Sequence, residues 1–325
     1  MLKAVKIRLY PNNQQKQLLE QSFGNCRWLC NSCLDLMNKT YKDTDKGLSG
    51  YDLKQQIPAL KKEYEWLGLT YSQCLQQVCL NLGVAFNNFF ERRVGYPRFK
   101  SKHNKQSIHY PQNVKVQNNC LRLPKIGEVK AVIHRPVEGK VKTVTISKNC
   151  CNQYQTSILV DDGKEKPEPS TEGNAIGIDL GLTHFAIASD GSKFGNPRWL
   201  AKHEKNLKRK QQQLSRKQKG SRNRNKARQK VAKAHHKISR CRGDFHHKLS
   251  PRIVDENQVI VVEDLAVKNM VKNHGLAKTI RPVGWGQFCT MLKYKDEQKG
   301  KIYQEVDRFF PSSKTCHVCL NQVGS

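Results

Sequence analysis

The sequence predicts an α+β protein of several domains, with an N-terminal β-barrel that is interrupted by a helical layer, followed by an α/β domain. Three observations predict this architecture. Strand-like runs separated by turn residues fill 1–13 and 95–160, whereas apolar residues three and four apart fill 14–94. The stretch 161–173 lacks apolar residues and predicts a linker. Strand and helix patterns then alternate over 174–310, as is typical of an α/β domain.

The first strand and the helical layer follow from hydrophobic periodicity. Residues 3–10 alternate in the manner of a strand, and a helix begins near Gln14. The pattern breaks at 45–50, where glycine and aspartate gather. From 72 to 93, apolar residues again recur three and four apart, which predicts an amphipathic helix with a core-facing side.

Residues 107–160 change to strand patterns, and a basic loop at 95–102 precedes them. In this loop, Arg98, Lys100 and Lys102 are candidates for binding phosphates, while interleaved aromatic residues offer stacking faces. The alternative is a solvated connector. The strand patterns lie at 114–116, 121–123, 129–133, 141–146 and 157–160.

Cysteine usage and the N-terminus indicate the compartment. Twelve cysteines without a secretory signal peptide favour a reducing compartment over a disulfide framework. No run approaches the roughly 18 apolar residues of a membrane span, so we expect a cytoplasmic, nucleoid-associated bacterial protein. Cys316 and Cys319 have the spacing of metal ligands in a loop-like context. Seven other cysteines are expected to be small core residues: Cys26, Cys30, Cys33, Cys74, Cys79, Cys150 and Cys151.

Charge is the most unusual global property of the chain. There are 58 Lys and Arg against 27 Asp and Glu, a net charge of +31, which predicts a polyanionic partner such as nucleic acid. Residues 202–242 hold 17 of these cations and one acid, Glu204. Leucines repeat every seven residues there, and after a break at 220–224 apolar residues again step by three and four. This pattern predicts a basic helical hairpin over 200–250. The hairpin residues that we expect to bind nucleic acid are Arg209, Lys210, Arg216, Lys217, Arg222, Arg224 and Arg228.

Two strand-like runs each carry a carboxylate. Asp179 lies inside the run 175–183, and Glu263 ends the run 258–263. A charge in a buried strand is costly unless something pairs with it. Magnesium prefers carboxylate oxygens, and two-metal sites activate water and stabilise the leaving oxygen of a phosphodiester. The pair therefore indicates the metal site of a ribonuclease-H-like (RuvC-type) nuclease.

Two alternatives compete with this metal site. Asp179 could cap the turn that follows it, and Glu263 could end a strand at the surface. An actin-like ATPase also carries Gly-x-Asp-x-Gly after a strand, but Leu182 replaces the small hydroxyl residue usual there, and no second glycine-rich phosphate loop follows. The nuclease interpretation is favoured.

The order of motifs resembles the TnpB (OrfB-type) family of insertion-sequence proteins, which are compact RNA-guided DNA nucleases. The motifs are VKIRLYP at 5–11, YPRFK at 96–100, GIDLG at 177–181, VVEDL at 261–265, GWGQF at 284–288 and PSSKTCHVC at 311–319. The resemblance implies a guide RNA and target double-stranded DNA as partners. It also implies a β-barrel wedge domain, a helical recognition lobe over 14–94, and a RuvC domain.

The resemblance assigns Asp179 and Glu263 to the first two catalytic, magnesium-binding carboxylates, and Cys316 and Cys319 to half of a zinc ribbon. The family continues to a second Cys pair and to a third catalytic carboxylate, whereas this sequence ends at Ser325. We therefore expect an incomplete two-metal Mg²⁺ site, a Zn²⁺ half-site at 311–325 that does not hold zinc stably, and impaired cleavage. The alternative function is a non-catalytic protein that binds guide RNA and DNA. A third possibility is a transposase that joins element ends itself, but the sequence shows no dedicated nucleophile for it.

Overall fold

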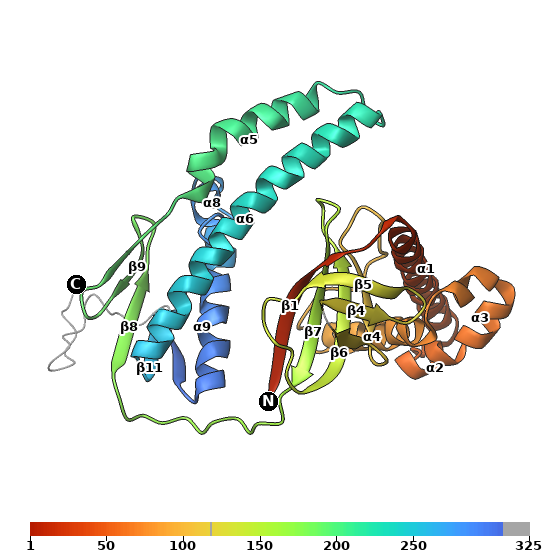
Figure 1. The fold of residues 1–325 in the computed structure, drawn as a ribbon, viewed down its shortest axis with the longest axis horizontal. Helices are drawn as coiled ribbons and strands as arrows, with labels where there is room; N and C mark the ends of the chain where they lie inside the picture. Colours follow the sequence, from red (N-terminus) through yellow and green to blue (C-terminus); the bar gives the residue numbers. More distant parts are fainter. Residues whose placement is uncertain (118, 308–325) are drawn as a thin grey trace. The chain divides into compact units, whose positions relative to one another are not determined.

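The computed structural model describes residues 1–117 and 119–307. The chain forms two compact units, Met1–Lys164 and Glu165–Ser325, each with its own core (Figure 1). Both units contain helices and strands, which confirms the mixed α/β class. Within the described ranges, no helix has both the length and the apolar character needed to cross a bilayer.

The first unit begins with a strand, continues with helices and ends with strands. The helices lie where the apolar periodicity predicts them, although the region after residue 50 forms two short helices and a 3₁₀ turn. The elements are β1 (Leu2–Tyr10), α1 (Asn13–Thr44), α2 (Gly50–Gln55), α3 (Ile57–Glu63), η1 (Glu65–Leu69), α4 (Ser72–Phe90), β2 (Gln106–Tyr110), β3 (Lys115–Gln117), β4 (Cys120–Leu123), β5 (Gly127–Val132), β6 (Lys140–Lys148) and β7 (Tyr154–Asp161).

The strands of this unit form one antiparallel sheet in the order β2-β6-β7-β1-β5-β4-β3. Strand β1 is central because it pairs along almost its whole length with β7 and, at its end, with β5. Among the described residues, β2 and β3 are the two edges of the sheet. The sheet is therefore open, and the β-barrel that the sequence predicts is formed in part, as a curled half-barrel.

One continuous core joins the sheet to the helices. Strand β7 alternates between buried and half-buried residues, as expected when one face of a sheet is covered. The covering helices, α1 and α4, pack against each other and against β2. Helix α1 starts at a capping box, in which the Asn12 side chain accepts a hydrogen bond from the Gln15 amide while Gln15 bonds back to Asn12. Gln15 also donates to the carbonyl of Glu128 at 2.7 Å, which ties the helix start to the sheet.

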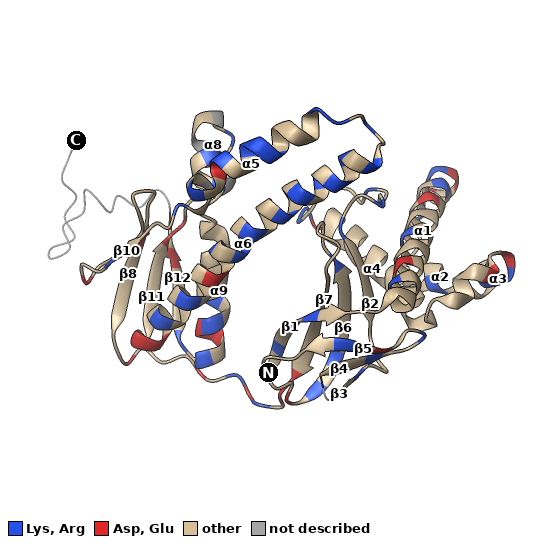
Figure 2. Cartoon of the chain, turned by 45° about the horizontal axis from the view of Figure 1, so that its top comes forward, with Lys and Arg blue, Asp and Glu red and all other residues tan. Residues whose placement is uncertain are grey.

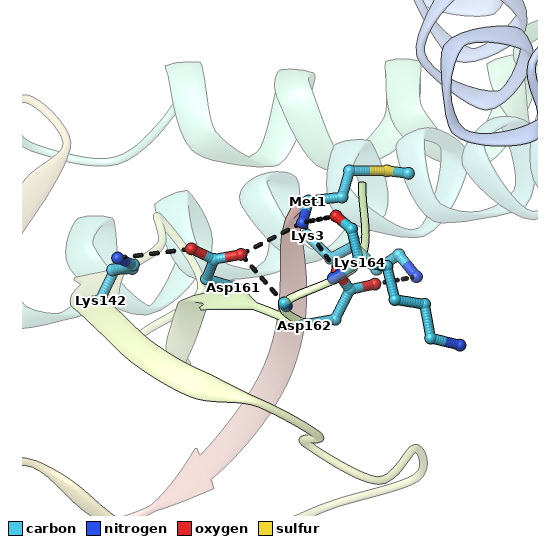
Figure 3. Close-up of polar contacts among 7 residues, drawn as sticks. Met1, Lys3, Lys142, Asp161, Asp162 and Lys164 are labelled. Atoms are coloured by element: carbon cyan, nitrogen blue, oxygen red, sulfur yellow. Dashed lines mark hydrogen bonds and ion pairs between the residues drawn. The ribbon is translucent and has the colours of Figure 1, made fainter. Parts of the chain in front are cut away.

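The start of β1 and the end of β7 are joined by charged groups (Figure 3). The amino group of Met1 donates to Asp161 Oδ1 at 3.1 Å and to Asp162 Oδ1 at 2.8 Å. Lys3 lies 2.7 Å from Asp162 Oδ2, and Lys142 lies 3.4 Å from Asp161 Oδ2. These cations lower the pKa of both carboxyl groups, and the aspartates raise the pKa of the amino group.

The second unit contains the strands that carry the candidate carboxylates. The predicted linker, 161–173, contains neither helix nor strand after Asp161, the last residue of β7. The elements are β8 (Ala175–Leu180), β9 (His184–Ala188), β10 (Lys193–Gly195), α5 (Trp199–Ser215), α6 (Arg222–Glu256), β11 (Val259–Glu263), α7 (Val267–Met270), α8 (His274–Ile280), α9 (Trp285–Lys299) and β12 (Ile302–Val306).

The sheet of the second unit combines two connection types. Its order is β10-β9-β8-β11-β12, in which β8, β9 and β10 form an antiparallel meander. Strands β11 and β12 then add in parallel to β8. Parallel strands that are neighbours in a sheet need long crossover connections. The connection from β10 to β11 contains α5 and α6, and the connection from β11 to β12 contains α7, α8 and α9.

One face of this sheet is covered by α6 and α9. Apolar residues from β8, β9 and β11 share a core with Leu249 and Val254 of α6 and with Phe288 of α9. His246 is fully buried among aromatic rings, and its Nε2 lies 3.1 Å from the carbonyl of Val283. Because a carbonyl only accepts, Nε2 carries the proton, and burial lowers the pKa of this histidine to about 4.

The cysteines of the first unit behave largely as the sequence predicts. Cys26, Cys30, Cys33, Cys74 and Cys79 are buried between α1 and α4, and desolvation raises the pKa of Cys26. Of the adjacent pair, Cys151 is buried but Cys150 is exposed. The core prediction is therefore wrong for Cys150, because consecutive residues in the turn after β6 point in different directions.

Candidate functional site: a carboxylate pair and basic surfaces

Asp179 lies on the uncovered side of strand β8. The strand alternates strictly, with Ile176, Ile178 and Leu180 in the core and Asp179 exposed. Side chains of successive strand residues point to opposite faces, so Asp179 lies on the face opposite α6 and α9. The sequence argument that Asp179 is a buried charge is therefore wrong, because the run is apolar on only one of its two faces.

Glu263 lies on the same face of the neighbouring strand. Strand β11 pairs in parallel with β8, with Val262 opposite Ile178. The next residues in this register are Glu263 and Asp179. Val262 is buried and Glu263 is exposed, which matches the alternation of β8. Paired residues of adjacent parallel strands project to the same side, so the fold brings the two predicted carboxylates together.

The residues flanking this pair are apolar. Asp179 has Ile187 of β9 as its other cross-strand partner, and Glu263 has Val306 of β12. Neighbouring strands lie about 4.8 Å apart, so both carboxylates are within reach of one cation. Among the residues that the structure describes, neither forms an ion pair with Lys or Arg. Lys293 lines the same cavity as Glu263 without forming an ion pair with it.

The donors of this pair fit a hard divalent cation, since carboxylate oxygens are the ligands that magnesium prefers. Other acidic residues lie nearby without joining it. Glu263 lines a cavity of about 280 Å³ together with Asp264 and Glu305. Over 1–117 and 119–307, however, no three His, Cys, Asp or Glu side chains lie close enough to hold a metal ion. Glu305 could not have been selected from sequence, because its strand shows no pattern distinctive of a site.

The predicted basic residues of 202–242 lie on a helical hairpin. Helices α5 and α6 pack against each other along their length and are joined by residues 216–221 (Figure 1). Figure 2 shows Lys and Arg repeated along both helices. Leu207 and Ile238 are buried on these helices, so the apolar seam is narrow. The exposed site residues are Arg209, Arg216, Lys217, Arg222 and Arg228, whereas Lys210 and Arg224 are half-buried.

Arg224 differs from its neighbours because its guanidinium is occupied within the hairpin. Its Nη1 donates to the carbonyls of Lys217 at 2.9 Å and Leu214 at 3.2 Å. Leu214 lies in the last turn of α5, where its carbonyl also accepts from the Lys217 amide at 3.2 Å, and Lys217 follows the end of the helix. Arg224 therefore holds the hairpin closed, and this role adds to its predicted one as a phosphate ligand.

The basic loop 95–102 is held against helix α1. Asn31 accepts a hydrogen bond from the Lys100 amide at 2.8 Å and donates to the Lys100 carbonyl at 3.0 Å. Arg98, Lys100 and Lys102 are exposed. The loop thus presents cations from a fixed backbone. Cys316 and Cys319, the predicted zinc ligands, lie outside the described residues.

Comparison with known proteins identifies the family. The chain is 37% identical over 324 residues to the "Putative RNA-guided DNA endonuclease" of Streptomyces pristinaespiralis, and the match covers 98% of this chain and 80% of that protein. It is 32% identical to the "Putative RNA-guided DNA endonuclease InsQ" of Escherichia coli K12, with 98% and 83% covered. Residues 153–274 match the OrfB_IS605 family model, described as a probable transposase. The chain belongs to the TnpB (OrfB-type) family. The resemblance seen in the motifs is confirmed.

Two further family models match parts of this TnpB-family chain. Residues 1–46 match a model described as a helix-turn-helix domain. The structure forms strand β1 and one continuous helix, α1, over most of this range. Residues 285–324 match the Cas12f1-like TNB domain. The structure of a Cas12f1–sgRNA–target DNA complex aligns over 99% of this chain at 13% identity, with a TM-score of 0.33. A likeness at this level supports no further statement.

Proposed function

We propose that this chain is an RNA-guided, magnesium-dependent DNA endonuclease of a transposable element. The observation that carries the proposal is the register of β8 and β11, which brings Asp179 and Glu263 onto one face of the sheet. Both carboxylates are exposed, and within the described part of the chain neither has a Lys or Arg partner. The named activities of the two relatives described above support the same conclusion.

The topology of the second unit supports a ribonuclease-H-like (RuvC-type) domain over 174–310. An antiparallel meander continued by two parallel strands puts the first strand, β8, in the centre of the sheet. A carboxylate on a central strand has a neighbouring strand on each side, from which a second carboxylate can come close to it. In the same proposal the open sheet of the first unit is the wedge domain, the helices within 14–94 are the recognition lobe, and 311–325 begins a zinc ribbon.

The chemistry assigned to the pair is phosphodiester hydrolysis. When bound, magnesium lowers the pKa of a coordinated water and neutralises the phosphate. Asp179 and Glu263 would supply oxygen ligands from two strand positions fixed by backbone pairing. Like charges on adjacent strands repel each other, and a shared cation removes that repulsion. The exposed face leaves room for a nucleic-acid backbone to approach.

The basic surfaces would bind the guide RNA and the target double-stranded DNA. The cations of loop 95–102 and the exposed site residues of the hairpin have no acidic partner in the described structure, as a phosphate-binding surface requires; these hairpin residues are Arg209, Arg216, Lys217, Arg222 and Arg228. Backbone contacts of this type position nucleic acid but carry no sequence information. In the proposal, base pairing with the guide supplies the sequence specificity.

The proposal is tested by cleavage of plasmid DNA with magnesium and the RNA that copurifies with the protein. Asp179→Asn and Glu263→Gln remove one ligand charge each with little change in shape, and both should abolish cleavage while RNA binding is retained. Glu172→Gln is the matched control, because Glu172 is an exposed acid of the same unit, and it should cut normally. Cleavage that survives both carboxylate variants would overturn the assignment.

The same assay decides between this function and the non-catalytic alternative. Tight, salt-sensitive binding of RNA without cutting by the unmodified chain would favour a guide-RNA and DNA-binding protein. The expectations of impaired cleavage and of a weak zinc half-site at Cys316 and Cys319 stay predictions. Measuring cleavage rate and bound zinc on the same preparation checks both.

A further inference from the structure

A large aromatic hollow opens on the helical part of the first unit. Its volume is about 780 Å³, and it lies between α1, α2, α4 and the basic loop. We call it the aromatic hollow and define it by six rings, those of Tyr41, Tyr51, Phe86, Phe89, Phe90 and Tyr96. Phe86 is buried, but Phe90 is 71% exposed, Tyr51 68% and Tyr41 56%. Large apolar groups left open in one concave place mark an interaction site.

The floor of the aromatic hollow is fixed by a contact between two glycines. A Cβ on Gly83 of α4 would lie 3.0 Å from the backbone nitrogen of Gly50, and a Cβ on Gly50 would lie 3.1 Å from the carbonyl oxygen of Cys79. The backbones of α2 and α4 therefore touch directly. Both glycines line the hollow together with Leu48 and Leu80, and Tyr51 follows Gly50 at its rim.

The rings on the other side are held edge-on to one another. Tyr96 packs against Phe86 and Phe89 with centroid distances of 5.5 and 5.1 Å and near-perpendicular planes. Its hydroxyl donates to Asn38 Oδ1 at 2.5 Å. Edge-to-face packing fixes the rings, while the exposed face of Phe90 is available for stacking. The hollow is thus preformed, with flat aromatic surfaces around the contact between Gly50 and Gly83.

The rim of the aromatic hollow is positively charged. Tyr96 belongs both to the hollow and to the segment 92–105, which contains no acidic residue. Asn31 fixes the backbone of this segment at Lys100, and the Lys54 amine lies 5.9 Å from the centroid of the Tyr51 ring. Glu91 immediately precedes the segment and pairs with Arg93 at 2.9 Å. The other cations of the segment are Arg92, Arg98, Lys100, Lys102 and Lys105.

We propose that the aromatic hollow binds unpaired nucleobases of a single-stranded nucleic acid whose phosphates lie on segment 92–105. This rests on the proposed function only in that the chain binds nucleic acid. Stacking platforms beside a basic groove are the general means of holding single strands. A second copy of the chain is disfavoured as the occupant, because each copy carries a net charge of +31.

The test measures binding of a short uridine oligomer, about 12 nucleotides long, and of an abasic strand of equal length, both in EDTA. Tyr51→Ala and Phe90→Ala should each weaken binding of the uridine oligomer by at least about fivefold, the loss of one stacked base. Binding of the abasic strand should not change, since it has the phosphates but no bases. Leu69→Ala is the control, because Leu69 is 54% exposed in the same helical layer and lies outside the hollow.

A cross-linking experiment gives a second readout. An oligomer with 5-iodouracil, irradiated with the unmodified protein, should form cross-links that map to the six rings. Equal losses for both strands, no loss, or cross-links confined to other regions would each overturn the proposal. So would a free protein that sediments as a dimer and becomes monomeric with Phe90→Ala, since a second copy would then fill the hollow. Because EDTA prevents cleavage, failure of the endonuclease assignment would leave this result unaffected.

Discussion

The hairpin of α5 and α6 allows a quantitative prediction about salt dependence. Arg216, Lys217 and Arg222 are exposed around its tip, and in the described structure none has an acidic partner. Each phosphate contact contributes about 0.9 to the slope of log K against log salt on duplex DNA. Replacing the three with Gln should therefore reduce the slope by up to about 2.7 if all three contact phosphates.

The change in slope becomes a measurable difference in affinity. Between 50 and 200 mM salt, the range over which such binding is usually compared, a slope difference of about 2.7 corresponds to roughly a 40-fold difference. Fluorescence anisotropy with a labelled duplex over this range measures it. Between 50 and 200 mM salt, the loss of affinity of the unmodified protein should be about 40-fold larger than that of the triple variant.

The same helix provides the matched control. Lys248 of α6 is 76% exposed but lies 2.9 Å from Asp244 one turn earlier, so its charge is already compensated. Lys248→Gln should change the slope by much less than Arg222→Gln does. If the triple variant keeps the original slope, or if Lys248→Gln lowers it as much as Arg222→Gln, the hairpin is not the phosphate-binding surface.

Three further predictions concern stability and positioning. Burial raises the pKa of Asp296 to about 6, so the folded protein keeps a proton there that the unfolded chain releases, and the free energy of unfolding falls as pH rises from 4 through 6. Asp296→Asn should remove about 3 kcal/mol of this fall, measured by unfolding curves across that pH range. The buried His246 changes the free energy of unfolding in the opposite direction with pH, but the unmodified protein and the variant both contain it, so its effect cancels in their difference. A difference in unfolding free energy that does not vary with pH would show that Asp296 is not the cause. Arg224→Ala should increase hydrogen exchange at the end of α5 by leaving the Lys217 carbonyl without its donor, a loss of about 1–3 kcal/mol. Unaltered exchange there would show that Arg224 does not close the hairpin. Asn31→Ala should loosen the backbone at Lys100 and raise exchange across 96–105, and equal protection in both proteins would argue against this anchor.

The elements of the fold were largely predictable where local patterns suffice. The apolar spacing of α1 and of α4 predicted these helices to within a few residues. Strand β2 was missed, because Gln106–Tyr110 has only two buried positions and gains its strand partner from β6, about 40 residues later. The open form of the sheet was missed for the same reason, since edge pairing is decided by tertiary contacts.

The carboxylate pair shows which part of a site the sequence determines. Two apolar strand patterns that each carry an acid suggest proximity, because such strands commonly pair, and the structure pairs them in register. The face on which Asp179 and Glu263 lie was not determined, since that depends on where α6 and α9 pack. Magnesium binding therefore has to be argued from an exposed pair without cationic partners, not from a buried charge that needs one.

The aromatic hollow marks the limit of pattern reasoning in a different way. Periodicity correctly grouped Phe86 and Phe89 on one side of α4, but it reports which residues share a face and not what covers that face. The cover is set by the glycine contact between α2 and α4, since a side chain at Gly50 or Gly83 would force the two backbones apart. Both glycines line the hollow, and Phe90 and Tyr51 are exposed around it. Substituting Gly83 with Ala should therefore alter the hollow and leave the carboxylate pair, which belongs to the second unit, unchanged, so that base stacking and cleavage chemistry can be perturbed separately.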